Sequence, residues 1–217
     1  MNHRRPRLDF HDLPAVWTRD PSCAAVLNAA GAMAPAVEPH LNQVLAQAAR
    51  RLGPEHGALK TQIRLLVRQE SEHVRLHEAF NQALYAQGFA ALGPLVNRLK
   101  EELAAQRDRR SFAFNLAWCA GFETLTLYLG QFLFGPGARW LQGGEPRAVA
   151  LWRWHLAEEH EHRSVCMAAY RALVGDYALR LRATAHAHSQ VGRYGARPWP
   201  CSAAMAASPS REPWRPT

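Results

Sequence analysis

The sequence has few cysteines and lacks several patterns that define a protein class. Four cysteines occur in 217 residues, and none forms a Cys-x-x-Cys pair. Such a chain does not build a disulfide framework, and we expect a reduced, cytoplasmic setting. The amino-terminal residues include Arg4, Arg5 and Asp9 instead of an apolar run, so we expect no secretory signal peptide.

Alternating apolar and polar runs, which are typical of half-buried strands, are nearly absent. The length is sufficient for one domain with a sizeable core, and we predict an all-α fold. The net charge is +8, but the arginines are spread over both ends and the expected helix surfaces. Without a dense basic stripe, the charge does not indicate nucleic-acid binding.

Start and stop signals divide the chain into a series of expected helices. Asp20 and Pro21 provide an N-cap and a proline at the first helical position. We expect one helix to end before Pro35 and the next helix to begin after it. The predicted helices cover residues 20–33, 36–51, 55–87, 89–107, 111–138, 145–174 and 176–191. We predict a flexible arm over residues 1–19, a bundle domain over 20–191, and a disordered, proline-containing tail over 192–217.

The segment 111–138 is the most apolar part of the chain, and Glu123 is its one charged residue. Its length would allow it to cross a bilayer, but a carboxylate at the middle of a lone span is costly. We expect no stable membrane span. We interpret the segment as the innermost helix of a bundle, with Glu123 directed at a metal ion.

Two segments place imidazoles and carboxylates on one helix face. His155, Glu159 and His162 are spaced by four and three residues. In another helix, Glu70, His73 and His77 are spaced by three and four residues, so each set shares one helix face. One such segment alone could be a solvated, salt-bridged face. The second segment continues in both directions as an apolar face, so its polar groups should point into a core.

Lone glutamates on two further apolar helices complete the pattern. Ferritin-like dimetal bundles take a Glu from each of two helices and a Glu-x-x-His pair from each of two others. We therefore predict a ferritin-like four-helix bundle with extra N-terminal and connecting helices, holding two divalent metal ions. The predicted metal ligands are Glu38, Glu70, His73, Glu123, His155, Glu159 and His162.

These motifs resemble known families. The runs around Glu70, His73 and His77 and around His155, Glu159 and His162 look like the bacterial family labelled predicted metal-dependent hydrolases, over about residues 20–180. The seven-residue set is also similar to the ligands of p-aminobenzoate N-oxygenase-type di-iron enzymes. These resemblances imply a metal-dependent enzyme.

Three further residues are candidates for supporting the ligands. His77 lies one turn beyond His73 and could be an additional ligand, a hydrogen-bond donor to a carboxylate, or a satisfied core histidine; we favour the supporting role. Glu158 and Glu161 flank the ligand face, where one could orient His155 or His73. Ion pairing in solvent is the competing interpretation for both glutamates.

The first functional interpretation is a di-iron oxygenase or oxidase, for which iron is the favoured metal and manganese or zinc are alternatives. Its catalytic candidates are the four carboxylates, with Glu70 and Glu123 bridging and Glu38 and Glu159 terminal or shifting. A hydrolase, in which the metals activate water, is the second interpretation. A non-enzymatic metal-binding bundle is the third. We expect a small-molecule substrate and consider an apolar one, together with an electron donor and a homodimer as further partners.

Overall fold

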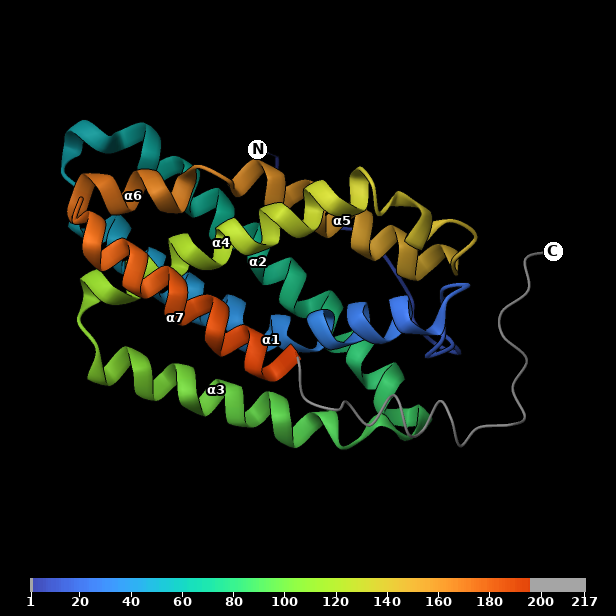
Figure 1. The fold of residues 1–217 in the computed structure, drawn as a ribbon. Coiled ribbons are helices and arrows are strands. Elements are labelled where there is room, and N and C mark those ends of the chain that lie inside the picture. The colour runs from blue at the N-terminus through green and yellow to red at the C-terminus, as the bar shows by residue number, and fades with distance from the viewer. Residues whose placement is uncertain (1, 196–217) are drawn as a thin grey trace.

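The computed structural model describes residues 2–195, and that part of the chain is helical without strands (Figure 1), which confirms the all-α prediction. The helices are α1 Pro21–Arg51, α2 Gly57–Leu84, α3 Leu92–Arg109, α4 Phe112–Phe134, α5 Pro146–His162, α6 Val165–Leu173 and α7 Tyr177–Gly195. Shorter helical turns cover Pro54–His56, Tyr85–Phe89 and Ala138–Leu141.

Helix α1 lies at the centre of the bundle. It packs along α2 and α3 and also contacts α4, while α4 packs against α5, α6 and α7. Helix α3 runs along the outer side of the bundle (Figure 1). Among the described residues, no helix combines the length and hydrophobicity needed to cross a bilayer. Helix α4 is buried from Asn115 to Gly121, but Tyr128, Phe132 and Phe134 nearer its end are exposed, so it is not enclosed on all sides as an innermost helix would be.

Helix α1 is continuous, whereas we expected a break at Pro35. Its N-cap is Asp20, whose side chain accepts a hydrogen bond from Ser22 N at 2.9 Å. Pro35 and Pro39 both lie inside the helix, although an internal proline costs about 3 kcal/mol. Every residue from 31 to 38 is buried, and this packing offsets the cost.

The single helix predicted over 145–174 is instead two helices, α5 and α6. The chain turns at Arg163 and Ser164, where the φ of Ser164 is −117° and the Arg163 side chain donates to the carbonyl of His160. Neither a glycine nor a proline marks this break. Helix α7 continues to Gly195, four residues into the predicted tail, and residues 196–217 of that tail lie outside the described residues.

Residues 2–19 contain no helix, but several of their side chains belong to the core. Phe10, Leu13 and Trp17 are buried. Phe10 packs edge-on against Phe80 of α2, and the Trp17 indole donates to Asn28 of α1 at 2.7 Å. The amino-terminal segment is thereby fixed against the two helices that carry Glu38, Glu70 and His73, while the boundaries at residues 20 and 191 stay a prediction.

Candidate metal centre

The structure gathers all seven predicted ligands into two buried groups. In each group, one oxygen or nitrogen atom per residue lies within 4.8 Å of the others, a spacing that could hold a metal ion. The first group is Glu38, His73, His155 and Glu159, and the second is Glu70, Glu123, Glu159 and His162. Glu159 belongs to both groups.

Four helices supply these side chains. Glu38 comes from α1, Glu70 and His73 from α2, Glu123 from α4, and the remaining three from α5. The three- and four-residue spacings on α2 and α5 place their groups on one helix face each, as the sequence predicted. Both faces point into the bundle, because every one of the seven residues is buried.

Glu159 divides its two oxygens between the groups. Its Oε1 lies 3.1 Å from His155 Nε2 and 3.6 Å from His73 Nδ1, whereas Oε2 lies 3.8 Å from His162 Nδ1. From the sequence we expected Glu159 to be a terminal or shifting carboxylate, and its role toward metal ions stays a prediction. Glu70, which we had expected to bridge, also faces both groups, at 3.4 Å from His73 Nδ1 and 2.8 Å from His162 Nδ1.

Each imidazole directs one nitrogen at the carboxylates and the other at a supporting side chain. His155 Nδ1 lies 2.8 Å from His77 Nε2, and His73 Nε2 lies 3.1 Å from Glu158 Oε2. His162 Nε2 lies 3.1 Å from Gln69 Oε1. Metal-binding histidines generally have such a partner, which fixes the ring orientation and the tautomer.

The supporting side chains continue into the amino-terminal segment. Arg4 donates to Glu158 Oε1 at 3.0 Å and to Glu161 Oε1 at 2.7 Å. Gln69 Nε2 donates to Glu161 Oε2 and to the carbonyl of Asn2. Glu158 thus contacts the candidate ligand His73 directly, whereas Glu161 accepts hydrogen bonds from Gln69 and Arg4. Asn2 and Arg4 therefore belong to the hydrogen-bond networks that support His162 and His73.

The sequence did not lead us to predict the supporting contacts made by Gln69, Thr126 and Arg4. Gln69 precedes Glu70 and is fully buried, and a polar residue beside the ligand motif was the only signal for it. Thr126 donates to Glu159 Oε2 at 2.8 Å, and its position one turn after Glu123 was a usable signal. Arg4 had none, because 154 positions separate it from Glu158.

The charged groups of the site are crowded. Burial, followed by the negative charge of Glu70, raises the pKa of Glu38 well above its usual value. Burial and the charge of Glu159 do the same to the pKa of Glu123. For Glu70, burial acts in this direction too, but His162 and His73 outweigh it and lower the pKa.

The imidazoles respond differently to their surroundings. Burial alone would lower the pKa of His73, but its contacts with Glu158 and Glu70 raise the pKa well above the usual value. Burial lowers the pKa of both His155 and His77, and neighbouring histidines add to this effect. Neutral imidazole is the form that binds metals.

These residues fit a pair of divalent ions. Both carboxylate oxygens of Glu70 and of Glu123 are buried without a hydrogen bond, as are Glu38 Oε2, His73 Nδ1 and His162 Nδ1. Glu70 Oε1 and His162 Nδ1 are 2.8 Å apart, but they are not aligned for a hydrogen bond. Within the described part of the chain, no Lys or Arg forms an ion pair with the four carboxylates. Two divalent ions would supply the missing partners and balance up to four negative charges.

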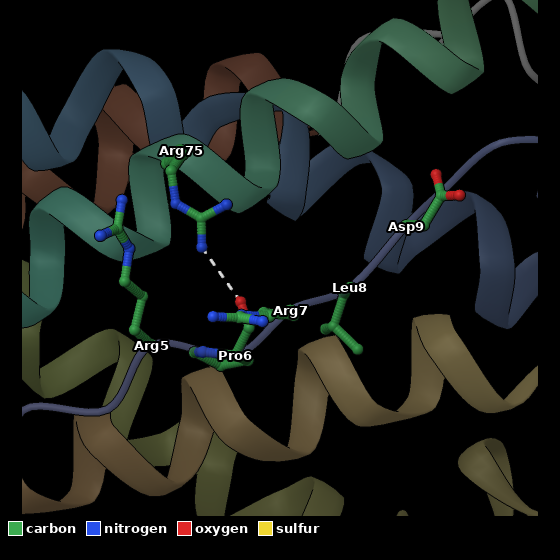
Figure 2. A pocket seen from close by; sticks show the side chains of 6 residues that line it. All are labelled: Arg5, Pro6, Arg7, Leu8, Asp9 and Arg75. Atoms are coloured by element: carbon green, nitrogen blue, oxygen red, sulfur yellow. Dashed lines mark hydrogen bonds between the residues drawn. The ribbon is translucent and has the colours of Figure 1, made fainter.

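The described residues line at least two hollows. One, about 230 Å³ in volume, includes Glu38, Thr126 and His155 in its lining. The other lies against the amino-terminal segment, where Arg75 donates to the carbonyl of Pro6 (Figure 2). Its lining consists of Arg5, Pro6, Arg7, Leu8, Asp9 and Arg75. None of the seven candidate ligands lines this second hollow, so of these two the first adjoins the site.

The fold and the paired groups define an all-helical bundle with a candidate site for metal ions. The chain belongs to the family described as predicted metal-dependent hydrolases, whose model matches residues 2–207. That match includes the amino-terminal segment with Arg4, beyond the range of about 20–180 that the motifs indicated. No curated protein and no solved structure matches the chain. The specifically ferritin-like arrangement therefore stays a prediction.

Proposed function

We propose that this chain is an enzyme with a dinuclear metal centre. Glu38, His73 and His155 would hold one ion, Glu70, Glu123 and His162 would hold the other, and Glu159 would contact both. The observation that carries this proposal is the division of Glu159, whose two carboxylate oxygens face different groups of buried ligands. Shared carboxylates allow two cations to lie close together despite their repulsion.

Iron is the metal we favour, with manganese and zinc as alternatives, because imidazole and carboxylate ligands suit all three. Iron in such a centre supplies O₂-dependent oxidation of a bound substrate, and this reaction draws on an electron donor. The chain's own residues bind and orient: Thr126 holds one oxygen of Glu159, and Gln69, His77 and Glu158 hold the rings of the three histidines.

The shape and polarity of the adjoining hollow favour oxidation over hydrolysis. Hydrolysis of an ester, amide or phosphoester benefits from hydrogen-bond donors aimed at the developing oxyanion. Thr126 carries the only hydroxyl in this lining and donates it to Glu159, so the indole N–H of Trp152 is the one unpartnered side-chain donor that the lining offers. The remaining walls are mostly apolar, as expected where an apolar substrate is oxidised.

Hydrolysis is the second candidate, and the description of the family favours it. Bound divalent ions can lower the pKa of water and make it nucleophilic near neutral pH. In that reaction, the same seven residues would hold the ions. Metal storage is a weaker third candidate, because the bundle positions three imidazoles with supporting side chains.

The deciding experiment is metal analysis of protein purified without oxygen, followed by exposure to O₂ while the absorption spectrum is recorded. We expect about two irons per chain and a transient, oxygen-dependent absorption. Two zinc or manganese ions without a response to O₂ would instead support the hydrolase. Glu159→Ala should lose both ions, whereas Glu101→Ala, at an exposed position of α3, should retain them. Absence of metal from the folded, unmodified protein would overturn the proposal.

A further inference from the structure

The hollow beside the candidate metal centre is built mainly from apolar side chains. It lies between α1, α4 and α5, and Val191 of α7 contributes to its lining. Its apolar walls include Val37, Leu129 and Leu156. A volume of about 230 Å³ equals that of about eight water molecules, at ~30 Å³ for each molecule in the liquid. One aromatic ring with a short substituent has this size.

The polar groups of the lining are confined to a few side chains that include two candidate ligands. Glu38 and His155 belong to the first metal group, and Glu38 Oε2 is buried without a hydrogen-bond partner. The indole nitrogen of Trp152, in the same lining, is also buried without one. In the metal-free protein, an unpartnered acceptor and an unpartnered donor therefore belong to one cavity, and the indole N–H stays unpartnered when an ion occupies the group that contains Glu38.

Charge restricts the class of ligand further. No lining residue is a lysine or arginine, and the charge of two bound divalent ions would be balanced by the four carboxylates, so a carboxylate or phosphate would lose its hydration without meeting a net positive charge. An uncharged hydroxyl or carbonyl would lose less hydration free energy on entering the cavity. A hydroxyl can both donate to a carboxylate and accept from an indole N–H.

We infer that this cavity is the substrate site, and that it accepts small, uncharged, mainly apolar molecules with a single hydroxyl or carbonyl group. The polar group of the ligand lies toward Glu38, His155 and Trp152, and its apolar part lies against α4. The inference deepens the proposed function, because it places the substrate beside the metal ions, but the cavity can be tested without activity.

The test uses two fluorinated probes that differ only in charge, 4-fluorobenzyl alcohol and 4-fluorobenzoate, and follows their binding by ¹⁹F NMR. We expect the alcohol to bind and the benzoate to bind at least about tenfold more weakly. In protein loaded with Mn²⁺, the unpaired electrons should broaden the signal of the bound alcohol, because the cavity adjoins the first metal group.

Variants locate the binding. Ala34 lines the cavity, and Ala34→Leu should weaken binding of the alcohol at least about tenfold by filling the space. Ala46→Leu is the matched control, because Ala46 lies on the same helix outside the lining and should leave binding unchanged. Leu129→Phe narrows the cavity from α4 and serves if Ala34→Leu does not fold.

The two proposals fail in different ways. Loss of Mn²⁺ binding with intact binding of the alcohol would contradict the dinuclear centre and leave the cavity assignment standing. Absence of binding by the folded protein, equal binding of the benzoate, or unchanged binding in both folded cavity variants would overturn the substrate inference. Binding of the alcohol without broadening by bound Mn²⁺ would overturn its position beside the metal.

Discussion

Arg4 and Glu158 are separated by 154 positions, and their side chains are joined at 3.0 Å. The other oxygen of Glu158 lies 3.1 Å from His73 Nε2. Arg4 is partly exposed, but the carboxylate between it and the histidine is fully buried. The amino-terminal segment is thus coupled to a candidate metal ligand through one intervening side chain.

Arg4→Met should weaken metal binding severalfold, because Glu158 would lose the cation that holds it against His73. Competition with a chromogenic chelator measures the affinity. Arg5→Met is the matched control: Arg5 pairs with Glu72 at 3.3 Å and has no contact with the ligand network. Equal affinities of the two variants would show that Arg4 does not position the centre.

His77 supports a different ligand, because its Nε2 lies 2.8 Å from His155 Nδ1. His77→Phe should remove this partner and weaken the first metal group about 10- to 100-fold while the second group still binds. Isothermal titration should then resolve one tight and one weak ion. His77→Gln retains a hydrogen-bonding side chain and should recover part of the lost affinity. Loss of both ions together would contradict separate support of the two groups.

The seven candidate ligands could be predicted because helical geometry determines which residues share a face. The spacing of Glu70 and His73, and of His155, Glu159 and His162, fixes two clusters before any packing is known. The sharing of Glu159 could not be predicted in this way. It depends on how α5 is rotated relative to α1 and α2, and the rotation is set by packing of the whole bundle.

The errors in the predicted helices also have physical causes. Pro35 is a strong helix breaker by propensity, but tertiary burial of its neighbours overrides that preference in α1. The turn at Arg163 and Ser164 has no breaking residue and follows directly after His162, the last candidate ligand of α5. Contacts such as that of Arg4 join segments that no local pattern relates.

Removal of metal should expose the cost of burying several carboxylates together. Glu123→Gln should make the metal-free protein more stable by about 1–2 kcal/mol near pH 7. Burial and the charge of Glu159 raise the pKa of Glu123, so folding opposes its ionisation, and a neutral amide does not carry this cost. The same variant should lose most of the stabilisation by metal, which for the parent is about 2.7 kcal/mol at 100 times the dissociation constant. Urea unfolding in EDTA and in excess Mn²⁺ measures both effects.

Glu123→Gln should thus raise the stability of the metal-free protein and reduce the stabilisation by Mn²⁺. This combination distinguishes a metal ligand from a purely structural glutamate. Glu101→Gln, at the exposed surface of α3, should change neither value. If Glu123→Gln instead destabilised the metal-free protein and left the effect of Mn²⁺ intact, Glu123 would be part of the core packing without a role in binding metal.

His40 should make stability of the metal-free protein depend on pH. Burial, followed by the positive charge of Arg107, lowers the pKa of His40 to about 4 from 6.5. The unfolded chain therefore binds a proton more readily than the folded one between these values, so stability is retained above pH 6.5 and falls as the pH decreases toward 4. The full difference corresponds to about 3 kcal/mol. His40→Phe should flatten this part of the pH profile, measured by urea unfolding in EDTA, whereas His11→Phe, at an exposed site, should preserve it. An unchanged slope in His40→Phe would mean that other groups govern the loss of stability in acid.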